Sequence, residues 1–129
     1  MSKILFIEDD FSVRFTLEKL LNFLDNEVEV ACSGEEGLSK IQMKTFFDII
    51  VCDIDMPLMD GFCCLEKILK LFPQPPFSSF IFISAYVDQN IIQKVLQIKA
   101  DCVIKKPIDQ EFLRIILLTL RIKHELNEI

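Results

Sequence analysis

The sequence has no cluster of basic residues. Its longest basic run is the pair Lys105-Lys106, and the formal net charge is −6. A nucleic-acid-binding surface needs concentrated positive charge, so we expect no direct nucleic-acid binding. Apolar runs long enough to span a membrane are also missing, which predicts no membrane association. A strand pattern begins at Lys3 and leaves no room for a signal peptide, so we expect a cytoplasmic protein.

The cysteines follow no metal-binding pattern. There are five, an odd number, and no spacing among them resembles a zinc site. Cys52 and Cys102 fall inside apolar runs, where a small thiol packs like a hydrophobic side chain. We therefore interpret the cysteines as reduced thiols, which fits a reducing compartment.

What the sequence does contain is a regular alternation of apolar runs and helical periodicities. Hydrophobic residues make up 51% of the 129 residues, enough for one domain with its own core, which we place at residues 1–129. Strands are predicted at Lys3–Ile7, Glu27–Cys32, Phe47–Asp53, Phe80–Ser84 and Cys102–Lys105, each followed by a helix. This order predicts an α/β fold, a doubly wound five-stranded parallel sheet flanked by five helices.

Polar residues follow four of these strands. They are Glu8-Asp9-Asp10 after the first strand, Asp53 and Asp55 at the third, Ser84 at the fourth and Lys106 after the fifth. The carboxyl ends of parallel strands share one edge of the sheet, where open α/β sheets bind ligands. We therefore expect carboxylates, a hydroxyl and an ammonium group to converge there, although Asp10 is better explained as the cap of the next helix.

Such a cluster of carboxylates needs a counter-ion. Two carboxylates about 4 Å apart repel by roughly 4 kcal/mol at an effective dielectric constant near 20. A hard divalent cation relieves this repulsion, and Mg²⁺ needs only a few carboxylates because it keeps several waters. With Lys106 and the Ser84 hydroxyl beside it, Asp53 has the surroundings of a nucleophile in phosphoryl transfer, forming an acyl phosphate.

These motifs resemble the receiver domain of two-component response regulators. The matching pieces are Ile4-Leu5-Phe6-Ile7-Glu8-Asp9-Asp10, the stretch from Asp53 to Asp60-Gly61 with its Met56-Pro57 and Met59, Ser84-Ala85, and Lys106-Pro107. The resemblance extends from Lys3 to about Thr119, and the stretch Asp-x-x-Met-Pro-x-Met-Asp-Gly is its most specific part.

The resemblance implies a role for each site residue. Asp53 would accept a phosphoryl group from a phosphohistidine on a sensor histidine kinase or histidine phosphotransfer protein. Glu8, Asp9, Asp53 and the backbone carbonyl of Asp55 would hold Mg²⁺, while Ser84 and Lys106 would bind phosphoryl oxygens. The Lys106-Pro107 bond would be cis. Phosphorylation would then shift the face formed by the fourth helix, fifth strand and fifth helix, where a downstream effector binds.

Three positions depart from the family pattern. Val103 occupies the place where these domains usually carry Tyr or Phe on the fifth strand, so the usual aromatic readout is not available. Tyr86, the only tyrosine, is expected at the rim of the site, controlling water access. Lys99 stands where the family often has Gly, and Glu8 replaces the commoner Asp but should still reach the metal.

The last helix is predicted to be unusually long, from Asp109 to Asn127. At 1.5 Å per residue it extends about 28 Å, further than the strands, so it should project beyond the domain from about residue 120. Ile115, Leu118, Ile122, Leu126 and Ile129 continue with helical spacing into that part. They indicate either an ordinary core helix with a frayed end or the surface of a homodimer.

Two other functions compete with a phosphorylated switch. Asp53-Ile54-Asp55, Ser84 and Lys106 are similar to the first three motifs of haloacid dehalogenase-type phosphatases. In those enzymes, however, an acidic pair follows the lysine, whereas here the acidic residues come first, at Glu8-Asp9. The other alternative is a pseudo-receiver that binds partners without phosphorylation. We expect a signalling switch rather than a turnover enzyme.

Overall fold

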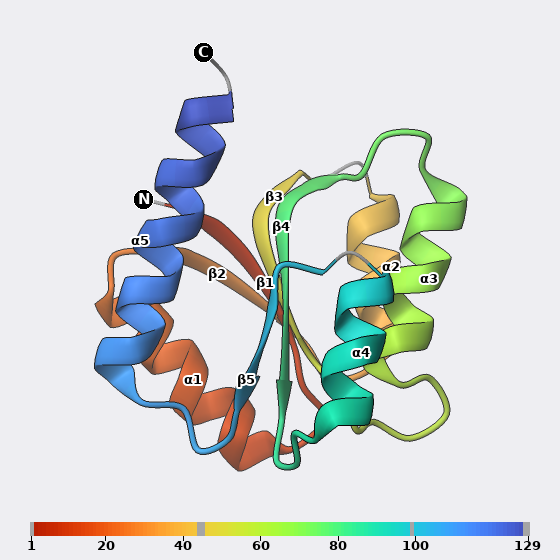
Figure 1. Ribbon diagram of the computed structural model, residues 1–129, viewed down its shortest axis with the longest axis horizontal. Coiled ribbons are helices and arrows are strands. Elements are labelled where there is room, and N and C mark those ends of the chain that lie inside the picture. Colours follow the sequence, from red (N-terminus) through yellow and green to blue (C-terminus); the bar gives the residue numbers. More distant parts are fainter. Residues whose placement is uncertain (1, 44–45, 99, 128–129) are drawn as a thin grey trace.

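The computed structural model describes residues 2–43, 46–98 and 100–127, and its strands and helices alternate along the chain (Figure 1). The elements are β1 Lys3–Ile7, α1 Phe11–Phe23, β2 Glu27–Ala31, α2 Gly34–Gln42, β3 Phe47–Asp53, α3 Gly61–Leu71, β4 Phe77–Ser84, α4 Gln89–Ile98, β5 Cys102–Lys105 and α5 Gln110–Asn127.

The strands form one sheet in the order β2-β1-β3-β4-β5, and every neighbouring pair is parallel. Helices α1 and α5 cover one face, while α2, α3 and α4 cover the other (Figure 1). The predicted doubly wound α/β fold is thus confirmed. The chain reverses the direction of winding at β1 and β3, and this is the place where such sheets open a crevice for ligands.

The apolar run in β3 is explained by burial on both faces of the sheet. Ile50 and Cys52 pack with α2, α3 and α4, whereas Ile49 and Val51 pack with α1 and α5. Because successive residues of a strand point to opposite faces, a strand covered on both sides is apolar throughout. The run ends at Asp53, which remains buried, with 2% of its surface exposed.

Strand β4 is longer than the sequence pattern indicated. It begins at Phe77 rather than Phe80, because Phe77 pairs with Phe47 at the start of β3 and Phe47 donates a hydrogen bond to the Pro76 carbonyl. The sequence pattern placed the start of this strand at Phe80, after a loop indicated by the prolines of Pro73-Gln74-Pro75-Pro76. Strand β2, in turn, ends at Ala31, one residue earlier than predicted.

Helix α5 has 18 residues and projects past the end of the sheet in Figure 1. Its core side carries the buried residues Leu113, Leu117 and Leu120. None of the described helices combines the length and apolar character of a membrane span. The predictions for Lys99 and Ile129 fall on positions outside the described residues.

Candidate functional site

The predicted site residues meet at the carboxyl edge of the sheet. Asp53 and Ser84 are the last residues of β3 and β4, and Glu8 and Lys106 directly follow β1 and β5. Glu8, Asp53 and Ser84 are each at most 2% exposed. The structure therefore brings four polar groups from four strands together at the crevice that the topology predicts, and Lys106 is the partly exposed one.

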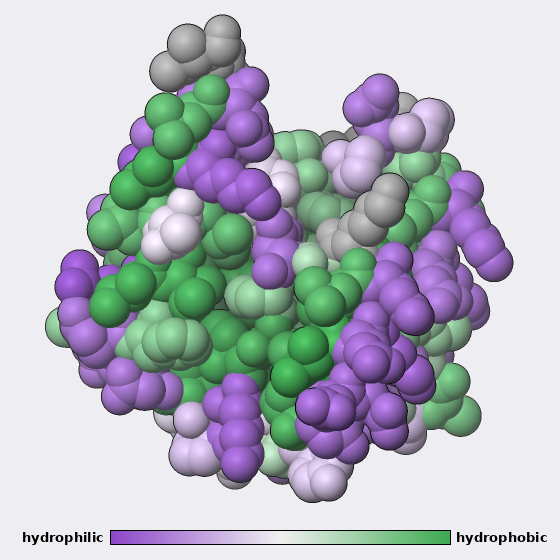
Figure 2. Space-filling view, viewed as in Figure 1, coloured by the Kyte–Doolittle hydropathy of each residue, from purple (hydrophilic) through white to green (hydrophobic). Residues whose placement is uncertain are grey.

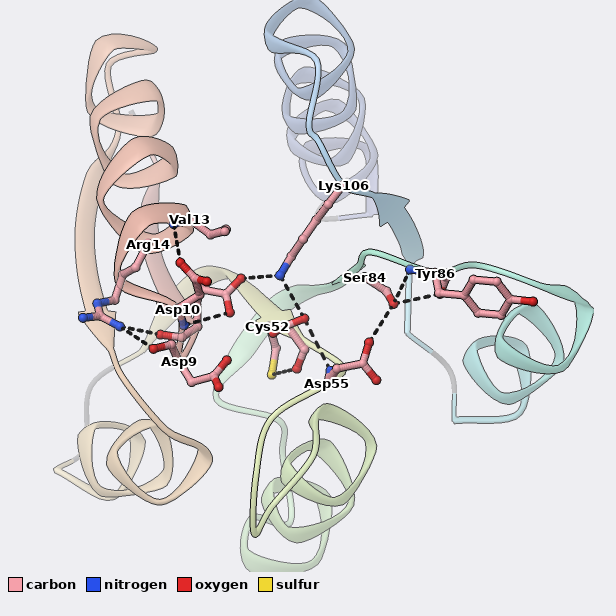
Figure 3. A network of polar contacts seen from close by, with 11 residues as sticks. Asp9, Asp10, Val13, Arg14, Cys52, Asp55, Ser84, Tyr86 and Lys106 are labelled. Carbon is pink, nitrogen blue, oxygen red and sulfur yellow. Dashed lines mark hydrogen bonds and ion pairs between the residues drawn. The ribbon is translucent and has the colours of Figure 1, made fainter.

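Lys106 joins the two buried carboxylates. Its Nζ lies 2.6 Å from Glu8 Oε1 and 3.3 Å from Asp53 Oδ1. Figure 3 shows the Lys106 side chain extending from the β5 side toward the acidic residues at the start of α1. Its position is fixed at the backbone as well, because the Lys106 amide donates to the Ser84 carbonyl at 2.8 Å. A partly buried cation at this position neutralises part of the acidic cluster.

The pKa values follow from this arrangement. Burial raises the pKa of Glu8, and its contact with Asp53 adds to that effect while Lys106 opposes it. Loss of hydration and the neighbouring Glu8 also raise the pKa of Asp9. Burial alone would lower the pKa of Lys106, but the Glu8 and Asp53 carboxylates outweigh it and raise that pKa. The site therefore disfavours the ionised forms of Glu8 and Asp9 and favours the protonated, charged form of Lys106.

The loop between β1 and α1 is held by Asp10 and Arg14. Asp10 caps α1, as predicted, by accepting a hydrogen bond from the Val13 amide at 3.1 Å. The Arg14 guanidinium donates to the Glu8 carbonyl at 2.8 Å, and the Asp10 amide donates to Glu8 Oε2 at 3.3 Å (Figure 3). Arg14 was not among the predicted site residues, because one arginine on a helix gives no pattern that marks it.

Three of the predicted metal ligands form one cluster. Glu8, Asp9 and Asp53 each offer a carboxylate oxygen, and these atoms lie within 4.8 Å of one another. An all-oxygen donor set of this kind suits a hard divalent cation such as Mg²⁺. For Asp55 the predicted ligand is the backbone carbonyl. Its side chain has Oδ2 3.2 Å from Ser84 Oγ, and its amide donates to Asp53 Oδ1 at 3.4 Å.

Gly61, the first residue of α3, lies directly against the end of β3. A Cβ atom added there would stand 2.6 Å from the Asp53 carbonyl oxygen and 3.0 Å from Ile54 Cα. The Gly61 amide donates to the Ile54 carbonyl at 2.9 Å, and Asp60 caps α3 through the Cys63 amide. The Asp60-Gly61 pair of the motif therefore has a steric explanation, since only glycine lets α3 approach β3 this closely.

Comparison with known proteins agrees with the fold and with the resemblance seen in the sequence. The model of the response regulator receiver domain family matches residues 4–118. The chain belongs to this family. Receiver domains are signalling switches of two-component systems, and their family function is to accept a phosphoryl group on an aspartate, with Mg²⁺ bound at an acidic pocket.

Relatives of similar length include chemotaxis proteins. The chain is 31% identical to the chemotaxis protein CheY of Treponema pallidum over 111 residues, which are 84% of this chain and 75% of that protein. The solved structure of chemotaxis protein CheY4 of Vibrio cholerae is 29% identical, with a TM-score of 0.84 and coverage of 93% of this chain and 98% of that one. A CheY-like receiver domain of Methanospirillum hungatei is 31% identical, with a TM-score of 0.81 and coverage of 99% and 97%.

The departures from the family pattern have visible consequences. Val103 on β5 is half-buried and packs against the core cluster on the α2–α3–α4 face, so this receiver domain has an aliphatic side chain at that point.

The Lys106-Pro107 bond is cis, as predicted. The Tyr86 ring points away from the site and is 68% exposed, whereas its backbone contacts Ser84 (Figure 3).

Proposed function

We propose that Asp53 is the phosphoryl acceptor of this receiver domain. An Asp53 carboxylate oxygen would form a bond to phosphorus while the phosphorus–nitrogen bond of a phosphohistidine breaks and the imidazole leaves with the electron pair. Lys106 and Ser84 would then bind the phosphoryl oxygens. The observation that carries the proposal is the partly buried Lys106 ammonium group, which lies 3.3 Å from Asp53 Oδ1 and can neutralise the negative charge of an arriving phosphoryl group.

The same proposal gives the acidic cluster a role. Glu8, Asp9 and Asp53, with the Asp55 backbone carbonyl, would hold Mg²⁺, which would supply positive charge against the carboxylates and the phosphoryl oxygens. The support is the convergence of three carboxylate oxygens in a site whose surroundings raise the pKa of Glu8 and Asp9. The chain itself positions these carboxylates. Arg14 binds the backbone carbonyl of Glu8, and Glu8 and Asp53 lie at the buried ends of β1 and β3.

We expect Asp53→Asn to abolish phosphorylation. With Mg²⁺ and radiolabelled acetyl phosphate, the unmodified chain should take up close to one phosphoryl group per molecule, and the variant should incorporate at least roughly a hundredfold less, because an amide is not a nucleophile of this kind. Incorporation can be measured by gel autoradiography or by intact-protein mass.

The matched control is Asp25→Asn, the same chemical change at an exposed position with a φ of 64°, which asparagine tolerates well. It should be phosphorylated normally. Equal labelling of Asp53→Asn and the unmodified chain would contradict the assignment of the acceptor. No labelling of the unmodified chain would favour a pseudo-receiver, and phosphate release with many turnovers from varied substrates would favour a phosphatase over the non-enzymatic switch that we propose.

We further propose that the phosphoryl donor is a sensor histidine kinase or a histidine phosphotransfer protein that docks beside Lys106. A mostly apolar cleft of about 500 Å³ opens there, lined by Val13, Leu17 and Leu20 of α1 and by Pro107 and Ile108. Lys106 lines the same cleft, so a helix placed in it would bring its phosphohistidine next to Asp53.

The buried free thiols of Cys52 and Cys64 support a reducing, cytoplasmic setting.

We propose that the domain signals through the face formed by α4, β5 and α5, which would contact an effector or a second copy of this chain. Support comes from exposed apolar side chains on α4 and α5. Ile92 and Leu96 are 44% and 72% exposed. On α5 the exposed apolar residues include Ile115, Leu118, Ile122 and Leu126. Figure 2 shows apolar surface along the outer side of α5 and between α5 and α4. Residues 1–129 would act as one unit, with α5 projecting from about residue 120.

For the homodimer, we expect Leu118→Glu to weaken self-association by roughly a hundredfold, because it places a charge in an apolar contact. Sedimentation equilibrium with and without beryllium fluoride, a phosphoryl mimic, measures the effect. Gln110→Glu adds the same charge to the same helix outside the apolar stripe and should leave association unchanged. A strict monomer at high concentration in both states would refute the homodimer and leave the effector as the partner of this face.

A further inference from the structure

The Ser84 hydroxyl is fully occupied in this structure. Ser84 Oγ accepts a hydrogen bond from the Tyr86 amide at 3.2 Å. It lies 2.8 Å from the Tyr86 carbonyl oxygen and 3.2 Å from Asp55 Oδ2, both of which can only accept. A hydroxyl has a single hydrogen to donate, and this one is shared between two acceptors on the side facing Tyr86 and Asp55. None is left for a phosphoryl oxygen on Asp53.

The position of Asp55 makes this contact a direct competitor of phosphorylation. Its amide donates to Asp53 Oδ1, so its backbone is anchored on the acceptor, while its carboxylate reaches across to Ser84 on the neighbouring strand (Figure 3). Ser84 is 1% exposed, so water offers its hydroxyl little alternative.

We propose that the Asp55 carboxylate is a positioning residue that holds Ser84 away from Asp53 and thereby slows phosphoryl uptake. The inference rests on the proposed function of Asp53 and adds a restraint to it. Ser84 must exchange its bonds to Asp55 and Tyr86 for one to the phosphoryl group, and the Asp55 bond is the one that a side-chain substitution can remove. The Asp55 backbone is unchanged by such a substitution.

The proposal predicts faster phosphorylation of Asp55→Ala, because alanine has no side-chain oxygen to accept the Ser84 hydrogen bond. We expect the uptake rate from acetyl phosphate to rise about fivefold, the factor that one hydrogen bond of ordinary net strength gives. Asp25→Asn, which removes a carboxylate charge at a distant exposed site, should not change the rate. An equal or slower rate for Asp55→Ala, with normal folding by circular dichroism, would overturn the proposal.

A double-mutant cycle with Ser84→Ala shows whether Asp55 acts through Ser84. If it does, Asp55→Ala should have no effect on uptake when residue 84 is alanine. If the acceleration persists there, simple charge repulsion explains it and the proposal fails. Should Ser84→Ala take up too little label to measure, the same four proteins can be compared by the melting-temperature shift on binding beryllium fluoride, with the same two outcomes. Failure of the unmodified chain to be labelled would instead refute the proposed function itself.

Discussion

Replacing Gly61 by alanine is expected to destabilise the domain by roughly 3 kcal/mol, the upper range for overpacking a core. The added methyl would lie 2.6 Å from the Asp53 carbonyl oxygen, 3.0 Å from Ile54 Cα and 3.1 Å from the Phe82 ring, so its two nearest neighbours are backbone atoms. Backbone atoms in a central strand cannot move aside as a side chain can. Either α3 or the end of β3 must shift, so phosphoryl uptake by Asp53 should fall as well. Urea denaturation and acetyl phosphate labelling measure the two effects.

Gly34→Ala is a closely matched control. Gly34 is likewise the first residue of its helix, α2, but its nearest neighbour is the Met59 sulfur at 2.8 Å, in a flexible side chain. Because methionine adapts to its surroundings, the loss of stability there should stay within about 1 kcal/mol. Similar losses for both variants would show that backbone proximity at Gly61 is not what requires glycine.

Lys106→Met is expected to lower the free energy of unfolding at pH 7 by roughly 3 kcal/mol, because it leaves the buried Glu8 carboxylate without its counter-charge. The loss should shrink as the pH falls. Burial already raises the pKa of Glu8, and removing the lysine that opposes this effect raises it further. At lower pH the buried carboxyl group is protonated and the cost disappears. Urea denaturation between pH 5.5 and 7.5 provides the measurement.

Two controls separate charge from packing. Lys105→Met removes the neighbouring exposed lysine and should change stability little. The double variant Lys106→Met with Glu8→Gln should recover most of the lost stability, since it removes both members of the pair. In the unmodified chain, the raised pKa of Lys106 means that the ion pair stabilises the fold below the ordinary lysine pKa of 10.5 and is lost as the pH rises through the higher folded value. A loss independent of pH and not repaired by the double variant would point to packing instead.

The fold could be predicted from the sequence where burial of a strand on both faces of the sheet determines which residues it contains. The uninterrupted apolar run before Asp53 indicated a strand covered on both faces, and it is one. The prediction was wrong at Phe77, where three prolines just before the strand indicated a loop. Pairing with Phe47, 30 positions earlier, decides where β4 begins, and such a contact leaves no local signal.

The site could be predicted to the level of which residues converge, but not of how they contact one another. Topology alone brings Glu8, Asp53 and Lys106 to one edge. That Lys106 lies closer to Glu8 than to Asp53, and that Asp55 turns to Ser84, depends on side-chain rotations and distances well below the spacing of strands. Gly61 was visible only as part of a motif, and its steric reason required the structure.

The ion pair between Glu8 and Lys106 joins residues 98 positions apart in the chain. Between them the chain must complete β3 and β4, and β5 must add to the edge of the sheet, before the ammonium reaches the carboxylates. Contacts of such wide separation form late in folding. A newly made or partly unfolded chain therefore contains Asp53 without the pair of Glu8 and Lys106 beside it. Under the proposed function, such a chain would not accept a phosphoryl group until its sheet is complete, because Lys106 would be missing from the site.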